Sequence, residues 1–102
     1  MISDVISKPV YQVLTDLTQE SRVEVALPIA IKDLVRLKLK DTTQQRLAFE
    51  QQYKMDFERF KQAWEQGMIP DQYSYPVEQD YWEWEASVTD GERLSKMLER
   101  LS

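Results

Sequence analysis

The segment Pro28-Ile-Ala-Ile-Lys-Asp-Leu-Val-Arg-Leu-Lys-Leu39 carries the clearest helical periodicity in this chain of 102 residues. Its apolar side chains recur three and four residues apart, which is typical of a helix with one apolar face. Because no glycine or proline interrupts residues 29–66, we expect one long helix over 28–53. Such a helix would span roughly 40 Å at about 1.5 Å per residue. A helix of that length in a small protein either projects from its domain or packs on another chain, so a homo-oligomer formed through this helix is one of two expectations.

The rest of the chain predicts further helices, so the expected fold class is mainly α. Pro9 is acceptable in the first turn of an N-terminal helix. Asp56 is a suitable N-cap, Gly67 is a suitable residue at a helix end, and Asp90-Gly91 indicates a break. The helices expected beside the long one are 9–19, 56–66, 76–89 and 92–101. Phe57, Phe60 and Trp64, at i, i+3 and i+7, are assigned to packing within the fold.

The segment Ser21-Arg-Val-Glu-Val-Ala-Leu-Pro28 has two interpretations. Ser21 with Glu24 fits a capping box, which would begin a helix at residue 22. Alternation of apolar with other residues instead indicates a short strand over 22–26 that ends before Pro28. Proline within a helix lacks a donor and clashes with the preceding turn, so we favour the strand, with the long helix beginning at Pro28.

Composition excludes several classes of protein. The chain lacks cysteine and histidine, so disulfide scaffolds, thiolate metal sites and histidine-based triads are absent. We see neither a secretion signal nor an apolar run long enough to span a bilayer, and we expect a cytoplasmic protein without membrane contact. The length suits one domain over 1–102. Its expected parts are an N-terminal helix region over 1–20, a helical body over 22–66 and an acidic aromatic segment over 67–102.

Charge is distributed unevenly along the chain, whose formal net charge is −5. Residues 22–46 contain six basic and three acidic residues. Residues 65–92 contain eight acidic residues, no lysine or arginine, and two of the three tryptophans. Tryptophan and tyrosine often anchor protein interfaces, while surrounding carboxylates attract a basic partner. The acidic segment is therefore our candidate surface for binding a basic protein.

The aromatic residues of this segment have both a structural and a functional interpretation. Val77, Tyr81, Trp84 and Val88 follow at i, i+4, i+7 and i+11, a stripe that fits a helix packed on the core. Trp82 lies about 100° around the helix from Tyr81, so it cannot share that face. The candidate partner-binding residues are Glu78, Asp80, Tyr81, Trp82, Glu83, Trp84 and Glu85.

The carboxylates show no pattern typical of catalysis. A calcium-binding loop and a glycine-rich nucleotide loop are both missing from the sequence. Runs of acidic residues more often form a solvated helix face than a metal site. We therefore expect a protein that is not an enzyme, without catalytic residues, bound metal or cofactor.

Residues near the start of the long helix suggest an alternative function in DNA binding. The sequence from Arg22 into the helix resembles the strand-Leu-Pro-helix opening of ribbon-helix-helix repressors, in which a two-stranded ribbon enters the major groove. Arg22, Lys32 and Arg36 are the candidate DNA contacts. One arginine on the ribbon is few for base recognition, so nucleic acid is the less favoured partner.

Two blocks of sequence resemble a family of small proteins, mostly cyanobacterial and archaeal. Phe49-Glu-Gln-Gln-Tyr-Lys-Met-Asp-Phe-Glu-Arg-Phe60 is similar to its motif F-E-x-K-Y-G-M-S-F-E-E-F. Glu78-Gln-Asp-Tyr-Trp-Glu-Trp-Glu85 is similar to its motif E-x-D-Y-W-E-W-E. The departures are Gln52 for lysine, Lys54 for glycine and Asp56 for serine. A side chain at Lys54 disfavours the left-handed backbone that glycine allows.

The resemblance implies an antitoxin encoded beside the toxin that it neutralises, and it implies no catalytic residue. Combined with the charge pattern, it predicts a non-enzymatic protein that occludes the basic active groove of a cognate toxin. The alternatives are a dimeric DNA-binding transcriptional regulator and an assembly subunit of a larger complex.

Overall fold

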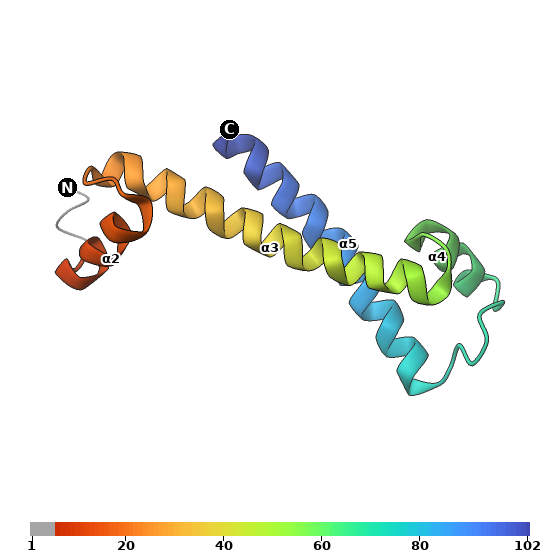
Figure 1. Ribbon diagram of the computed structural model, residues 1–102. Helices are drawn as coiled ribbons and strands as arrows, with labels where there is room; N and C mark the ends of the chain where they lie inside the picture. Colours follow the sequence, from red (N-terminus) through yellow and green to blue (C-terminus); the bar gives the residue numbers. More distant parts are fainter. Residues whose placement is uncertain (1–5) are drawn as a thin grey trace.

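The computed structural model describes residues 6–102, which form four helices and no strand (Figure 1). The mainly α fold class is therefore confirmed. The helices are α2 (Lys8–Thr18), α3 (Val23–Tyr53), α4 (Phe57–Glu65) and α5 (Tyr75–Leu101). The helix expected over 56–66 is present as α4, and the long helix ends at Tyr53 as expected.

The molecule is elongated because the N-terminal part of α3 extends beyond its packing against α5 and is followed at its far end by α2 (Figure 1). The principal extents are 56 × 25 × 22 Å. The radius of gyration is 19.5 Å, against about 13 Å for a compact domain of this length. We call residues 49–88 the core end and residues 8–37 the N-terminal arm.

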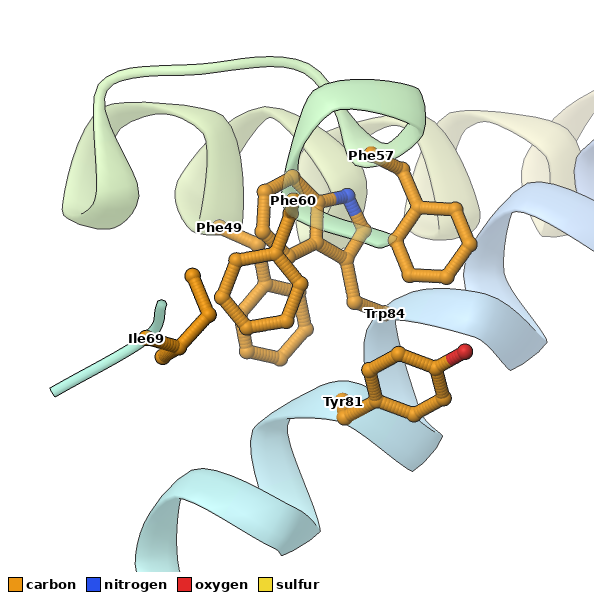
Figure 2. Packing of buried hydrophobic residues seen from close by; sticks show 6 residues of the cluster. All are labelled: Phe49, Phe57, Phe60, Ile69, Tyr81 and Trp84. Carbon is orange, nitrogen blue, oxygen red and sulfur yellow. The ribbon is translucent and has the colours of Figure 1, made fainter. Parts of the chain in front are cut away.

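An aromatic cluster forms the hydrophobic core at the core end (Figure 2). The Trp84 side chain, from α5, is fully buried at its centre. Its ring centroid lies 4.8 Å from that of Phe60, 5.4 Å from that of Phe57 and 5.6 Å from that of Phe49. Aromatic pairs at such distances add to the free energy of burial. The core thus joins α3, α4 and α5, and it confirms the assignment of Phe57 and Phe60 to the fold.

The turns around α4 follow from local backbone chemistry. Lys54, the C-cap of α3, takes a left-handed backbone with φ of 58°, although it carries a side chain. The Asp56 carboxylate then accepts a hydrogen bond from the Arg59 backbone N–H at 2.9 Å, which confirms it as the N-cap. At the other end, Gly67 has φ of 69°. Its N–H and that of Met68 complete a Schellman motif, so the predicted role of Gly67 is also confirmed.

The loop between α4 and α5 is held by one buried polar side chain. Gln72 Nε2 donates to the Trp64 carbonyl oxygen at 2.8 Å, and Gln72 Oε1 accepts from the Ile69 N–H at 3.4 Å. These bonds satisfy a buried amide and hold Ile69 against the aromatic cluster.

The strand expected over 22–26 is wrong, because α3 begins at Val23. Val23 and Ala26 are its buried residues here, three positions apart, and α2 packs on this part of α3. The alternation of apolar residues over 22–26 therefore does not indicate a strand, because the residues that are buried follow helical spacing. Pro28 lies inside the helix, in its sixth position, and not at its start. The capping box is not formed either, since Arg22 is the N-cap and has no side-chain cap bond.

The break expected at Asp90-Gly91 is also wrong, because α5 continues through both residues. Gly91 lies where α5 crosses α3, and a Cβ built on it would lie 3.8 Å from Thr42 Oγ1. A glycine in a helix costs about 1 kcal/mol relative to alanine, and packing of the two helices outweighs that cost here. The helices expected over 76–89 and 92–101 are thus one helix.

Candidate protein-binding surface

Helix α5 divides the seven candidate partner-binding residues between two sides. Trp84 has no exposed surface and Tyr81 is 8% exposed, so both lie in the core and not on the surface. Their prediction as anchors for a partner is therefore wrong in this conformation, and the interpretation of the stripe as core is confirmed. The physical reason is that Phe49, Phe57 and Phe60 from α3 and α4 surround this face of α5 (Figure 2).

The Asp80 carboxylate on α5 is hydrogen-bonded to two side chains of α3. Its Oδ2 accepts a hydrogen bond from the Tyr53 hydroxyl at 2.5 Å and another from Gln52 Nε2 at 3.1 Å. Burial raises the pKa of the Tyr53 hydroxyl, and the hydrogen bond to the Asp80 carboxylate and its negative charge raise that pKa further. Asp80 thus has a structural role between α3 and α5.

Trp82 lies on the outer side of α5, and its side chain is 61% exposed. Its ring contacts Tyr81 edge-on, with the ring centroids 5.2 Å apart. Glu78 and Glu85 flank it one turn away on either side, and Glu83 is the next residue along the chain. This tryptophan is therefore an apolar side chain presented to solvent among carboxylates.

The carboxylates around Trp82 keep their negative charge uncompensated within the chain. Among residues 6–102, none of Glu78, Glu83 and Glu85 lies within ion-pair distance of a lysine or arginine. Glu83 accepts a hydrogen bond from Gln79 Nε2 at 2.9 Å, which leaves its charge in place. The pKa of Tyr81 is raised first by burial and then by the charges of Glu85 and Glu65. The surface therefore has a negative potential that a basic partner would complement.

Tyr75 is a further candidate that the sequence pattern did not single out. It lies seven residues before Trp82, on the same side of α5, and its side chain is 78% exposed. The sequence does contain a signal for it, because Tyr75 does not belong to the helical stripe that includes Tyr81 and shares its side of the helix with Trp82. Together, Tyr75, Glu78, Trp82, Glu83 and Glu85 form what we call the acidic aromatic surface.

The basic candidates for DNA binding do not form a ribbon. Arg22 Nε lies 3.1 Å from Glu20 Oε1, and Arg36 Nη1 lies 3.7 Å from Asp33 Oδ1. Lys32 and Arg36 share one side of α3, one turn apart. Because residues 22–26 are helical, the two-stranded element that would enter the major groove is missing from the described structure. DNA binding in the ribbon-helix-helix manner therefore has no structural basis in this conformation.

The described residues contain neither a cluster suited to a metal ion nor a helix suited to crossing a membrane. No group of three or more acidic side chains within 6–102 is placed to hold a metal ion. In the same part of the chain, no helix combines the length and apolar character needed to cross a bilayer.

Comparison with protein-family models, curated proteins and solved structures gives no match to this chain. The resemblance to the antitoxin-like family therefore stays a prediction.

Proposed function

We propose that this protein is a non-enzymatic inhibitor that binds a basic partner protein through its acidic aromatic surface, as an antitoxin binds a toxin. The observation that supports the proposal is the exposed Trp82 among carboxylates without basic partners in the described chain. An exposed tryptophan is a frequent anchor of interfaces, and its burial against a partner gains more free energy than that of most side chains.

The mechanism that fits this surface is occlusion of an active groove. Proteins that act on RNA or nucleotides hold phosphates with lysine and arginine side chains. Glu78, Glu83 and Glu85 would pair with those side chains in place of the phosphates, while Trp82 and Tyr75 would fill the apolar space beside them. In this proposal the protein acts in the cytoplasm, where such substrates are found.

Co-expression with the product of the adjacent gene tests the proposal. We expect that product alone to slow growth, and we expect this chain to bind it and restore growth. Trp82→Ala should weaken the complex by about 2 kcal/mol or more, roughly 30-fold in Kd, because the anchor is lost. Titration calorimetry measures the affinity, and circular dichroism verifies that α5 is intact.

Two matched variants make the test specific. Leu47→Ala removes an exposed apolar side chain of α3 that does not belong to the acidic aromatic surface. It should leave the affinity for the partner unchanged. Glu78→Gln with Glu85→Gln should slow association and reduce its dependence on salt, because the steering charge is smaller. A neighbour that is harmless and does not bind, or a Trp82→Ala protein of unchanged affinity, would contradict the proposal.

A further inference from the structure

The N-terminal arm exposes apolar side chains that the chain itself does not cover. In α2 no residue is buried, and Val10, Val13 and Leu17 are all more than half exposed. Leu34 and Leu37 of α3 are also more than half exposed. Isolated exposed aliphatic residues are common, but the apolar residues of α2 line one shallow hollow together with Pro9, and such a group indicates an interaction surface. This surface is separate from the acidic aromatic surface, at the opposite end of the molecule (Figure 1).

The apolar face of α2 is self-complementary. Val10, Val13, Leu14 and Leu17 are spaced by three, one and three residues, a pattern that is the same in both directions. Two α2 helices packed antiparallel around a two-fold axis would therefore place Val10 against Leu17 and Val13 against Leu14. In a two-fold dimer each copy contributes the same surface, so a pattern symmetric under reversal fits a second copy of the chain.

Charge supports the same antiparallel arrangement. Lys8 lies in the first turn of α2, Asp16 lies in its last turn, and Glu20 follows in the loop. An antiparallel pair brings Lys8 of each copy to the end where Asp16 of the other copy lies, whereas Glu20 is already paired with Arg22 of its own chain. Opposite charges then meet at both ends, whereas a parallel pair would place like charges together.

The chain also exposes more surface than a compact protein of its mass. It exposes 7679 Å², whereas a compact protein of 12.1 kDa exposes about 6,000 Å². This excess belongs to the whole elongated chain, and it is larger than the roughly 800 Å² that each partner buries in a standard interface. From these observations we infer that the chain forms a two-fold dimer through its N-terminal arm, with α2 packed antiparallel against α2 of the second copy.

Sedimentation equilibrium of the full-length protein tests this inference without any other partner. We expect a mass of twice 12.1 kDa at micromolar concentrations. Val13→Glu with Leu17→Glu should raise the dimer dissociation constant by roughly 100-fold or more and leave helicity unchanged, since both positions are exposed in the monomer. Leu47→Glu, a matched change at an exposed leucine outside the arm, should leave the mass at that of the dimer.

Charges of opposite sign introduced at Val13 test the position of the two-fold axis of the dimer. Because the two copies of Val13 lie beside it, Val13→Glu alone and Val13→Lys alone should both be monomers. Mixed in equal amounts, they should form a heterodimer, because the two opposite charges then lie next to each other across the axis. A monomeric wild-type protein, a dimer insensitive to Val13→Glu with Leu17→Glu, or one that Leu47→Glu also dissociates would overturn the inference. These outcomes are independent of whether the acidic aromatic surface binds a toxin.

Discussion

At the core end, α3, α4 and α5 surround Trp84 with aromatic side chains, whereas in the N-terminal arm α2 contacts α3 without burying any residue of its own. Both regions are helical and both contain apolar residues at helical spacing. The difference lies in the number of elements, since the core end packs three helices together and the arm packs two. Two short amphipathic surfaces cannot enclose each other's apolar faces, so part of each stays in contact with water.

The buried core and the exposed apolar surface thus lie at different ends of this chain. The core end contains the buried aromatic cluster, and its exposed Trp82 lies on α5, the helix that also contributes Trp84 to that cluster. The arm exposes apolar side chains that its own helices do not cover, and the proposed dimer would stabilise it by burying them. Regions of low local contact density open more readily than the core, so hydrogen exchange should be faster in α2 than in α5.

Replacing the central side chain of each region should give the largest contrast in stability. Trp84→Ala should lower the free energy of unfolding by about 3–5 kcal/mol, because it leaves a cavity among Phe49, Phe57 and Phe60. Leu17→Ala should lower it by about 0.5 kcal/mol or less in the monomer, since that side chain is 76% exposed. Urea denaturation followed by circular dichroism measures both values.

Trp84→Phe is the control for the cavity. Among the described residues, the buried Trp84 Nε1 has no hydrogen-bond partner, so phenylalanine loses no hydrogen bond and retains much of the packing. It should therefore destabilise the protein clearly less than Trp84→Ala does. Equal effects of Trp84→Ala and Leu17→Ala would show that the two regions do not differ as described.

A smaller effect is expected at the contact between α3 and α5 near the core. Tyr53→Phe removes the hydrogen bond to Asp80 and should cost about 1–1.5 kcal/mol at pH 7. The pKa of Tyr53 is higher in the folded protein than the value near 10 of an unfolded chain. Its contribution is therefore complete below about pH 10 and is lost as the pH rises through the folded pKa. Denaturation at pH 7, 9, 10 and 11 measures this loss.

Two variants show whether Tyr53 causes the loss of stability at high pH. Tyr53→Phe should have a flatter decline of stability above pH 10 than the wild type, because the group that titrates is gone. Tyr73→Phe changes a side chain that is exposed in the loop before α5 and controls for the substitution itself. A decline that is the same in Tyr53→Phe and in the wild type would exclude Tyr53 as its cause.

The contrast between the two regions could be predicted from the sequence only in part. Helical periodicity predicted the fold class, and Asp56 and Gly67 predicted both ends of α4, because these features depend on neighbouring residues. Helix geometry also predicted that Trp82 and Trp84 could not share a face. It left open which of them was buried, since that depends on aromatic side chains from α3 and α4 that are distant in sequence.

The two wrong predictions of secondary structure, the strand over 22–26 and the break at Asp90-Gly91, have a similar physical origin. Val23-Glu-Val alternates like a strand, but packing of α2 on Val23 and Ala26 makes the helix more stable there. Asp90-Gly91 is a typical turn sequence, but the crossing of α5 with α3 retains the helix through it. In both places tertiary contacts outweigh local preference, which a single sequence does not reveal.

The smallest effect is predicted at two equivalent positions, the residues that end α3 in the core end and α2 in the arm. Lys54 and Gln19 end α3 and α2 with nearly the same left-handed backbone, with φ of 58° and 57°. Glycine relieves the strain of that conformation but makes the unfolded chain more flexible, so the expected net gain is about 0.5–1 kcal/mol at either site. In a Val13→Glu background, which removes the proposed dimer, Lys54→Gly should raise the stability to global urea denaturation. Gln19→Gly should mainly slow hydrogen exchange in α2, because the arm opens before the core unfolds. Equal gains in global stability would show that arm and core unfold as one cooperative unit, and the separation argued above would then be wrong.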